Sequence, residues 1–472
     1  MAGAKAYKVG EAGSPSFPED FEVTQKAVLQ VTDIKTNRNK YYAIELHAAG
    51  GAFRVFTHYG RTDDLETNPD AGAKECRFFD AHGEAQACYE SIYRQKTSAA
   101  KGYKELSLAS SKIGSQKARG TSAGEVDAKT IAKIAEQQKD RPPPPVSKLE
   151  PLVQSLVGYI YGEATNALTS TVSAKITAQG IETPLGVLTL GQIERGESIL
   201  QQLYAVFQSG KQRRDDMERL SGEFYTAIPH RIGRTRAAIE QSVIASMEAF
   251  EQKQETLQLM KDMLNVNGDT SVLYDSKVDN QFEALRCNIA ALEPGSQRFK
   301  EIEEFVLKSQ VKSKNIKVQN VYMLRRPDEW DAFDANLANQ RWLFHGSRIK
   351  NWVGLLSRGI LMPKIVVSMG VNRTDAGWLG NGMYFGDAAC TSAFYTTAGR
   401  KGTRLMGIAR VALGQMKDYT RITYGIEGPP PGFHSCHGVR HTPKAPSQFQ
   451  DDEYVIYKTN QQRLETLVEF AA

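Results

Sequence analysis

Three short stretches towards the C-terminal end of the chain carry reactive or aromatic side chains beside glycines. They are LFHGSR around His345, MYFGDAACTSAFY with Tyr384, Ser392 and Tyr395, and DDEYVIY with Glu453. Glycine lets a backbone approach a flat ligand closely, because it has no Cβ atom to collide. Taken singly, each stretch is also compatible with a structural histidine, core tyrosines or a solvated strand edge. Any chemistry therefore depends on the three stretches meeting in the fold.

Other nucleotide and metal motifs are not supported. No G-x-x-x-x-G-K-[ST] loop occurs, and the glycines of GWLGNGMYFG are in the wrong order for a dinucleotide fingerprint. His434, Cys436, His437 and His441 in HSCHGVRH suggest zinc at first sight. Three of these ligands crowd into four positions, and no second ligand pair is nearby. We therefore predict no metal site.

The composition describes a globular protein of several domains. With 472 residues, of which 41% are hydrophobic and 24% charged, the chain is too long for one core and is neither fibrous nor disordered throughout. The five cysteines are never spaced C-x-x-C, which argues against a disulfide framework and a cysteine-rich zinc finger. No apolar run is long enough for a membrane span, and MAGAKAYKVG lacks the apolar stretch of a signal peptide. We expect a soluble intracellular protein without a membrane partner.

The elements that precede these stretches begin with a small domain and a linker. The polar segment 1–20 is expected to be flexible. KYYAIEL and FRVFTHY alternate in hydrophobicity on either side of AAGGA, which predicts a β-hairpin in a small α+β domain over 21–106. This domain is expected to close with a helix near 84–96. Residues 107–146 are basic, rich in Ser, Gly and Ala, and end in four prolines, so they predict a flexible linker.

Helical periodicity dominates the middle of the chain. Apolar residues recur at helical spacing within 191–208 and 239–264, which predicts an all-α bundle over 147–268. From 275 to 472, short β-rich runs alternate with glycine and proline clusters, which predicts an α+β, mainly β, domain with few helices. Its clearest predicted strands are 318–324, 404–413 and 453–458. The three chemistry-bearing stretches all lie in this last domain.

Together these patterns resemble a known family. LFHGSR, GNGMYF with TSAFY, and DDEYVIY, in this order, resemble the His-Tyr-Glu signature of the ADP-ribosyltransferase fold in poly(ADP-ribose) polymerases. SKLEPLVQSLVGYIYG, TPLGVLTLGQI and FYTAIPH are similar to the helical autoinhibitory domain of the DNA-dependent members. TNRNKYYAIEL and HYGRTD are similar to their WGR domain. The resemblance implies three modules: a WGR-like DNA-sensing domain, a helical regulatory domain and an ADP-ribosyltransferase domain.

The resemblance also implies a role for each residue of the signature. The family cleaves the nicotinamide–ribose bond of its substrate NAD through a transition state with oxocarbenium character, which requires a carboxylate near the sugar. Glu453 would bind the 2′-hydroxyl of that ribose, stabilise the cation and polarise the acceptor. Tyr384 and Tyr395 would enclose the nicotinamide ring. The other implied contacts are those of Gly346 and Ser392 with the carboxamide, of His345 with the adenosine ribose, and of Ser347 and Asn351 with the adenosine half.

In the WGR-like domain the resemblance implies contacts with DNA. Tyr59 replaces the tryptophan of the domain's name and would stack on a sugar or base, while Arg61 would pair with phosphate. Arg38 and Lys40 are further candidate DNA contacts. In the family's working model, a DNA strand break binds here and loosens the helical domain, which opens the NAD site. The net charge of +5 permits this partner without requiring it.

Departures from the family pattern keep alternatives open. Thr391 stands where polymerising members usually carry a lysine, Gln258 stands where relatives often have an acid, and the loop from Gly438 to Asp452 is short. We expect a poly-ADP-ribosyltransferase that is activated by DNA strand breaks and modifies itself and other proteins in the DNA damage response. The alternatives are a mono-ADP-ribosyltransferase and an NAD-binding DNA-end scaffold without turnover. An accessory factor is a further candidate partner, and the expected location is the nucleus in a eukaryote or the cytoplasm and nucleoid in a bacterium.

Overall fold

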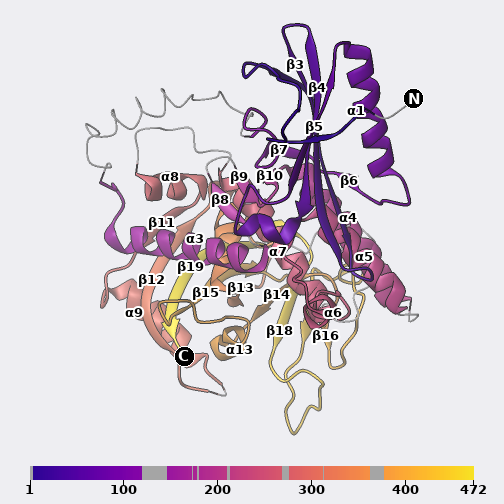
Figure 1. Ribbon diagram of the computed structural model, residues 1–472. Coiled ribbons are helices and arrows are strands. Elements are labelled where there is room, and N and C mark those ends of the chain that lie inside the picture. Colours follow the sequence, from indigo (N-terminus) through magenta and orange to yellow (C-terminus); the bar gives the residue numbers. More distant parts are fainter. Residues whose placement is uncertain are drawn as a thin grey trace. The chain divides into compact units, whose positions relative to one another are not determined.

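The computed structural model describes residues 4–119, 146–172, 174–177, 180–209, 213–267, 276–311, 313–361 and 377–472. The chain divides into two compact units, each with its own sheets and helices (Figure 1). Unit 1 comprises Met1–Pro142 and Leu168–Leu264, and unit 2 comprises Pro143–Ala167 and Asn265–Ala472. Within the described part of the chain, no helix combines the length and the apolar character needed to cross a membrane.

Unit 1 contains a six-stranded sheet in the order β1-β5-β4-β3-β2-β6. Its strands are β1 (Tyr7–Lys8), β2 (Glu22–Asp33), β3 (Arg38–Ala49), β4 (Ala52–Arg61), β5 (Ala73–Phe79) and β6 (Lys104–Glu105). The predicted hairpin is β3–β4, and its turn uses Gly50 and Gly51 at φ of +54° and +88°, which glycine adopts without strain. Strand β1 lies within the segment predicted to be flexible, but pairing with β5 holds it on the sheet.

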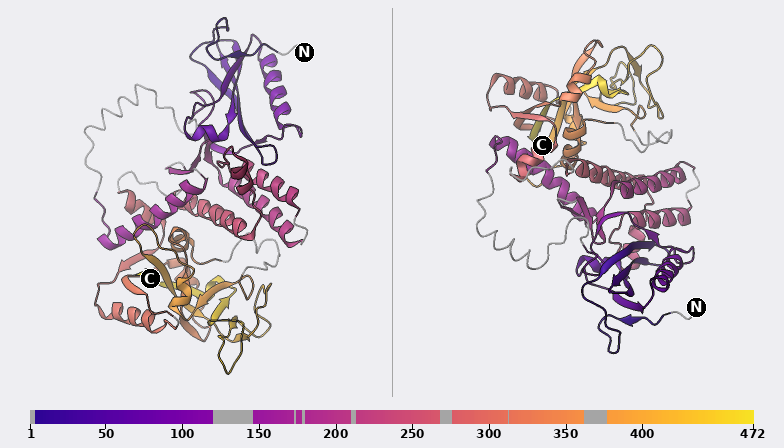
Figure 2. Two further views of the ribbon diagram at one scale, coloured as in Figure 1. Left: turned by 60° about the horizontal axis from the view of Figure 1, so that its bottom comes forward. Right: turned by 90° about the horizontal axis from the view of Figure 1, so that it is seen from above.

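Both faces of this sheet are covered, although the alternating pattern predicted one buried face. Helix α1 (His82–Thr97), predicted near 84–96, lies along one face, where Tyr89 packs with Ile44 (Figure 1, Figure 2). Tyr41 on the other face packs with Leu106 and Ile113. The segment that follows α1 therefore covers the second face, and local alternation carries no information about such a distant partner.

The prediction of a flexible linker is wrong for residues 107–119. Strand β7 (Leu108–Ser111) pairs with β10 (Gly186–Leu188), which is distant in sequence. The buried carboxylate of Glu45 accepts hydrogen bonds from the backbone N–H of Ser115 at 2.8 Å and from its hydroxyl at 2.5 Å. A polar composition indicated a linker because these long-range partners cannot be recognised locally. Residues 120–145 of the predicted linker lie outside the described residues.

The remainder of unit 1 is mainly helical, as predicted. Its helices are α4 (Leu190–Gln208), α5 (Arg214–Ala227), α6 (Arg236–Gln241) and α7 (Met247–Asn267), of which α7 extends beyond the unit. Residues of the predicted stripes are buried, among them Leu200, Tyr204 and Phe250. Strands β8 (Lys175–Thr177) and β9 (Gly180–Thr183) join β10 and β7 in a four-stranded sheet that the helical pattern did not predict.

Unit 2 is built on a nine-stranded sheet in the order β11-β12-β19-β15-β13-β14-β18-β17-β16. Its strands are β11 (Asn288–Ala291), β12 (Lys317–Arg325), β13 (Gln340–Gly346), β14 (Met383–Gly386), β15 (Arg404–Ala412), β16 (Met416–Tyr419), β17 (Ser435–Gly438), β18 (Glu453–Ile456) and β19 (Gln462–Ala471). The strands predicted at 318–324, 404–413 and 453–458 are confirmed as β12, β15 and β18. Among the described strands of this sheet, only β16 and β17 pair in parallel.

The part of unit 2 predicted to be mainly β, residues 275–472, has more helix than the sequence predicted, whereas the helix that begins at Pro151 lies in the segment predicted to be helical. The helices of unit 2 are most of α3 (Pro151–Val172), with α8 (Lys277–Ala284), α9 (Gln297–Lys308), α10 (Pro327–Ala332), α11 (Trp352–Arg358) and α13 (Ala389–Ala393). Helix α9 packs Phe299 and Ile302 against Ile408 and Val468 of the sheet. Helices as short as α10, α11 and α13 span two turns or fewer, so they show little periodicity in sequence.

Candidate functional site

The end of strand β13, between β15 and β14, carries His345 and Gly346. His345 Nδ1 lies 3.1 Å from the backbone oxygen of Tyr384. A carbonyl oxygen only accepts, so Nδ1 carries the hydrogen, and Nε2 is an acceptor in the neutral ring. Burial lowers the pKa of His345, which favours this neutral form. The fold therefore fixes both the orientation and the tautomer of the predicted histidine.

Gly346 lies where strand β13 meets helix α13. A Cβ atom at this position would collide with the backbone oxygen of Ser392 and lie 3.3 Å from the Cβ of Tyr395. Ser392 itself is buried. The structure thus brings together Gly346 and Ser392, predicted to contact the carboxamide of nicotinamide, and Tyr395, predicted to enclose its ring. The close approach requires glycine.

Glu453 begins strand β18 in the middle of three strands. In register it lies opposite Gly386 of β14 on one side and opposite Gly438 of β17 on the other. A Cβ at Gly386 would lie 3.4 Å from the Ser392 hydroxyl. Neither directly opposed residue therefore has a side chain, and at Gly438 the Phe449 ring fills the place that a Cβ would take. Burial, followed by the negative charge of Asp451, raises the pKa of Glu453 to about 7.

Tyr384 lies on β14, diagonal to Glu453 and on the same face of the ladder. Its hydroxyl donates to the backbone oxygen of Gly380 at 2.7 Å and accepts from the N–H of Leu379 at 2.9 Å. Burial, with the charge of Glu453 contributing, raises the pKa of Tyr384. These bonds fix the ring. Tyr395 is 65% exposed, so most of its ring surface is accessible to a partner.

Ser347 and Asn351 follow Gly346 directly in the chain. Asn351 ends the short 3-10 helix η2 (Ile349–Asn351), and its Nδ2 donates to Ser347 Oγ at 3.2 Å. All eight predicted NAD-site residues thus lie on β13, β14, α13 or the start of β18, or on the segments that follow β13 and α13. The enclosure of nicotinamide by Tyr384 and Tyr395 and the adenosine contacts remain predictions.

A charged network beside Glu453 was not predicted as part of the site. Thr391 Oγ1 donates to Asp451 at 2.7 Å. His437 bridges Asp418 through Nδ1 at 2.8 Å and Asp452 through Nε2 at 2.9 Å. The stretch HSCHGVRH, which contains His437, could have indicated this network, but by itself it suggested only a zinc motif. Within the described residues, no group of three or more His, Cys, Asp or Glu side chains is arranged to hold a metal ion.

The candidate DNA-binding residues lie together on the hairpin β3–β4. Lys40 is exposed and pairs in register with Arg61, and Tyr59 stacks on Tyr42 with ring centroids 5.2 Å apart. The Tyr59 hydroxyl donates to Glu75 at 2.8 Å. Arg38 donates to the backbone oxygen of Lys101 at 2.5 Å. A further cation that the sequence did not single out is Lys96 of α1, whose ammonium lies 4.0 Å from the Tyr42 ring centroid.

Arg61 is already engaged within unit 1. Its Nε lies 2.8 Å from Asp63, and its guanidinium donates to the backbone oxygens of Asn37 at 3.1 Å and Gly233 at 2.6 Å. Only 16% of the side chain is exposed. The structure therefore places Arg61 between the hairpin and the segment after α5, whereas Lys40 beside it faces solvent.

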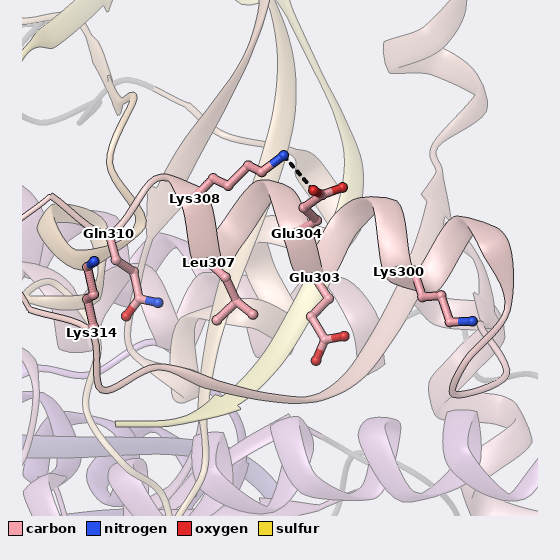
Figure 3. A pocket seen from close by; sticks show the side chains of 7 residues that line it. All are labelled: Lys300, Glu303, Glu304, Leu307, Lys308, Gln310 and Lys314. Carbon is pink, nitrogen blue, oxygen red and sulfur yellow. Dashed lines mark ion pairs between the residues drawn. The ribbon is translucent and has the colours of Figure 1, made fainter.

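A separate surface hollow of about 570 Å³ lies along α9 (Figure 3). Its lining residues are Lys300, Glu303, Glu304, Leu307, Lys308, Gln310 and Lys314. An ion pair of 2.5 Å joins Lys308 and Glu304 on the helix. None of the predicted site residues lines this hollow, and its mixture of lysines and glutamates favours no ligand charge.

Three family models match the chain in sequence order. They are the WGR domain at residues 25–109, the regulatory domain of poly(ADP-ribose) polymerase at 147–283, and the poly(ADP-ribose) polymerase catalytic domain at 296–472. The residues discussed above divide accordingly. The His345, Tyr384 and Glu453 set falls in the catalytic match, and the hairpin residues fall in the WGR match.

The chain is also similar to curated relatives. The chain is 32% identical to protein mono-ADP-ribosyltransferase PARP4 of Mus musculus over 67% of its own length, but spans only 15% of that relative. It is 26% identical to poly [ADP-ribose] polymerase 2-A of Oryza sativa subsp. japonica, covering 91% of this chain and 64% of the relative. It is also 26% identical to protein mono-ADP-ribosyltransferase PARP3 of Mus musculus, covering 96% and 88%.

Proposed function

Because the chain belongs to the poly(ADP-ribose) polymerase family, we propose that it is an NAD-dependent ADP-ribosyltransferase that modifies proteins, itself included. The observation that carries this proposal is the half-buried Glu453 carboxylate between Gly386 and Gly438, on the same face as Tyr384. A carboxylate held in a partly desolvated site interacts strongly with a developing cation. The residues that would bind the leaving group lie on adjoining elements.

In the proposed reaction, the bond between C1′ of the ribose and the nicotinamide nitrogen breaks, and its electron pair leaves with nicotinamide. The ribose becomes oxocarbenium-like and is stabilised by the ionised Glu453. A nucleophile of the acceptor protein then bonds to C1′ and loses its proton. Tyr384, fixed by Leu379 and Gly380, would present one face to the nicotinamide ring.

The leaving group would be held by backbone and hydroxyl groups at the junction of β13 and α13. Gly346 approaches Ser392 and Tyr395 more closely than a residue with a Cβ atom allows. His345 is neutral and hydrogen-bonded through Nδ1, and its Nε2 would accept a hydrogen bond from a ribose hydroxyl. These contacts orient NAD and leave Glu453 as the charged group beside the reacting sugar.

The first experiment incubates the full chain with adenylate-labelled NAD, with and without nicked or 5′-phosphorylated DNA duplexes, followed by a denaturing gel. A DNA-stimulated ladder that Glu453→Gln abolishes would support a break-activated polymerase. A single labelled band would identify a mono-ADP-ribosyltransferase. The absence of any label in all arms would favour an NAD-binding scaffold and overturn the transferase proposal.

The mono-ADP-ribosyltransferase alternative is favoured by one observation. Thr391 occupies the position where polymerising members usually have a lysine, and its hydroxyl is bound to Asp451. Under this alternative, Thr391→Lys places a cation beside Asp451 and lengthens the product. The same gel measures it, with the product of the unchanged chain as reference.

We further propose that DNA strand breaks bind the hairpin surface of unit 1 and stimulate turnover. Support comes from exposed Lys40, from stacked Tyr59 and Tyr42, and from Lys96 over the Tyr42 ring. Lysines would neutralise phosphates, while an aromatic ring would stack on an end base. Arg61 forms an ion pair with Asp63, so Lys40 is the stronger candidate for a phosphate contact. In a eukaryotic cell this function belongs in the nucleus.

A further inference from the structure

His437 occupies an unusual position beside the proposed site. On β17, it lies between Asp418 of β16 and Tyr454 of β18 in register. Its ring stacks on Tyr454 with centroids 4.7 Å apart and an interplanar angle of 4°. Only 13% of the side chain is exposed. The two ring nitrogens lie 2.8 Å from Asp418 and 2.9 Å from Asp452.

This geometry determines the protonation state of His437. Ionised carboxylates only accept hydrogen bonds, so both ring nitrogens must donate, and only the imidazolium ion can do so. Burial by itself lowers the pKa of His437, but the hydrogen bonds and charges of Asp452 and Asp418 outweigh it and raise that pKa. In turn, burial raises the pKa of Asp452, but the bonds from His437 and from the N–H of Arg440 outweigh it and lower that pKa.

The other charged groups around the imidazolium come from neighbouring elements. Arg440, on the loop after β17, donates its backbone N–H to Asp452 at 2.9 Å and its guanidinium to Asp387 at 2.9 Å. Arg341 of β13 donates to the Tyr454 hydroxyl at 3.1 Å. Asp451 lies 3.8 Å from the Arg440 guanidinium. The acids Asp387, Asp451 and Asp452 thus share two cations, His437 and Arg440.

These contacts hold the backbone on both sides of the carboxylate proposed to act on the ribose. Asp452 directly precedes Glu453, and Asp387 directly follows Gly386, the cross-strand neighbour of Glu453. Arg440 connects the two, and His437 holds Asp452 from the side of Asp418. If His437 loses its proton, it can donate to only one of its two carboxylates, and the positive charge between Asp418 and Asp452 disappears. Both changes weaken the hold on Asp452 and therefore on the backbone that positions Glu453.

We propose that His437 is a positioning residue that, as an imidazolium ion clamped between Asp418 and Asp452, holds Glu453 in its reactive geometry. This inference rests on the proposed transferase function. It gives the histidine-rich stretch HSCHGVRH a role without metal. It also predicts that turnover falls at alkaline pH because His437 loses its proton, in addition to the fall at acidic pH that follows from protonation of Glu453.

The test measures nicotinamide release by the full chain across pH 6 to 10 for the unchanged protein and for His437→Gln, His437→Lys and Asp418→Asn. The matched control is His441→Gln, because the exposed His441 is hydrogen-bonded through Nδ1 to the backbone of Ser447. We expect His437→Gln to lower kcat roughly ten- to hundredfold with little change in the KM for NAD, and to remove the alkaline loss.

Two variants keep the inference testable if His437→Gln is unstable. His437→Lys keeps a cation between the carboxylates and is expected to regain most of the lost kcat without an alkaline loss below pH 9. Asp418→Asn changes a carboxylate that is 66% exposed, and it is expected to move the alkaline loss to lower pH because it removes one anion from His437. His441→Gln is expected to match the unchanged protein.

The outcomes distinguish the positioning role of His437 from the proposed transferase function. If the unchanged protein turns over NAD and His437→Gln has the same kcat and the same loss of turnover at alkaline pH, the positioning role is overturned and the transferase proposal stands. An alkaline loss that does not move in Asp418→Asn would also overturn the positioning role. No nicotinamide release by the unchanged protein, with or without broken DNA, would overturn the proposed function and this inference with it.

Discussion

Glu453 is placed where its charge is costly. Its pKa is raised to about 7, first by burial and then by the neighbouring Asp451. A folded-state pKa above that of the unfolded chain means that the folded state loses stability as pH rises from the unfolded value to the folded one. The fold keeps this unfavourable carboxylate, which is what an electrostatic role towards a cationic sugar requires.

Replacing this carboxylate separates function from stability. Glu453→Gln is expected to lower kcat for nicotinamide release at least a hundredfold, because a neutral amide cannot stabilise the cation. At pH 8 the same variant is expected to gain on the order of 1 kcal/mol in free energy of unfolding, since no buried charge remains. Thermal unfolding and kinetics measure the two effects. Glu427→Gln, at an exposed residue, is the control and should change neither.

The raised pKa of Glu453 also predicts how activity depends on pH. Only the ionised form stabilises the cation, so kcat/KM should fall as pH drops through about 7, by about tenfold for each further unit. Asp451→Asn removes the anion that contributes to the shift, so its acidic loss should begin at lower pH than in the unchanged protein. A profile of kcat/KM between pH 5 and 8 measures this. An unmoved midpoint would show that Asp451 does not act on Glu453.

At the scale of elements, the site depends on how closely β13 approaches α13. The strand ends at Gly346, and the short helix begins at Ala389, without a side-chain cap. Their contact is backbone to backbone, so neither element can shift without moving Ser392 and Tyr395. In unit 1, a short element also joins two others. The 3-10 helix η1 (Thr62–Glu66) follows the hairpin, and its Asp63 accepts hydrogen bonds from the segment after α5.

Gly346→Ala tests the contact between β13 and α13. The added Cβ would collide with the backbone oxygen of Ser392, so one of the two elements must move. We expect KM for NAD to rise at least tenfold and the melting temperature to fall by several degrees. Gly428→Ala is the matched control, because its Cβ would meet no atom within 4 Å and its φ is not positive. Wild-type kinetics in Gly346→Ala would contradict the proposed role of this backbone.

Asp63 tests the connection in unit 1. Its carboxylate accepts the N–H groups of Ile232 at 2.9 Å and Gly233 at 3.1 Å and pairs with Arg61, and its side chain is only 7% exposed. Asp63→Ala leaves these donors without their acceptor, so we expect a loss of about 3 kcal/mol in free energy of unfolding. Asp64→Ala removes an exposed pair with Arg234 and should cost less than about 1 kcal/mol. Denaturant unfolding compares them.

At the scale of the whole molecule, the two units carry different proposed tasks. Unit 1 holds the hairpin with the candidate DNA contacts, and unit 2 holds the NAD-site residues. The net charge of +5 over 472 residues is too small to direct DNA to one surface. The proposed DNA binding therefore depends on the local arrangement of cations and aromatic rings on unit 1.

Lys40 tests whether this surface binds DNA. Lys40→Ala removes one candidate phosphate contact, so binding should weaken at every DNA sequence, and the slope of log affinity against log salt should fall by about 1. Fluorescence anisotropy with a nicked duplex at several salt concentrations measures it. Lys300→Ala, an exposed lysine of unit 2, is the control. An unchanged slope in Lys40→Ala would place the DNA contacts elsewhere.

The sequence by itself determined the three modules, which the family models match, and it predicted the residues of the site. Local alternation around Gly50 and Gly51 was enough for the β3–β4 hairpin, because turn and strand preferences are properties of neighbouring residues. Helical spacing identified the buried stripes of α4 and α7 for the same reason. The order of the three signature stretches indicated NAD chemistry at His345, Tyr384 and Glu453 before any contact between them was known.

Only the tertiary structure decided which groups meet across the chain. The folding of residues 107–119 onto the sheet, the engagement of Arg61 with Gly233, and the bridge from Asp418 through His437 to Asp452 all join residues that are distant in sequence. The same holds for the pKa of Glu453, since burial between β14 and β17 sets it. These properties depend on packing and on the exclusion of water, which no short stretch of sequence contains.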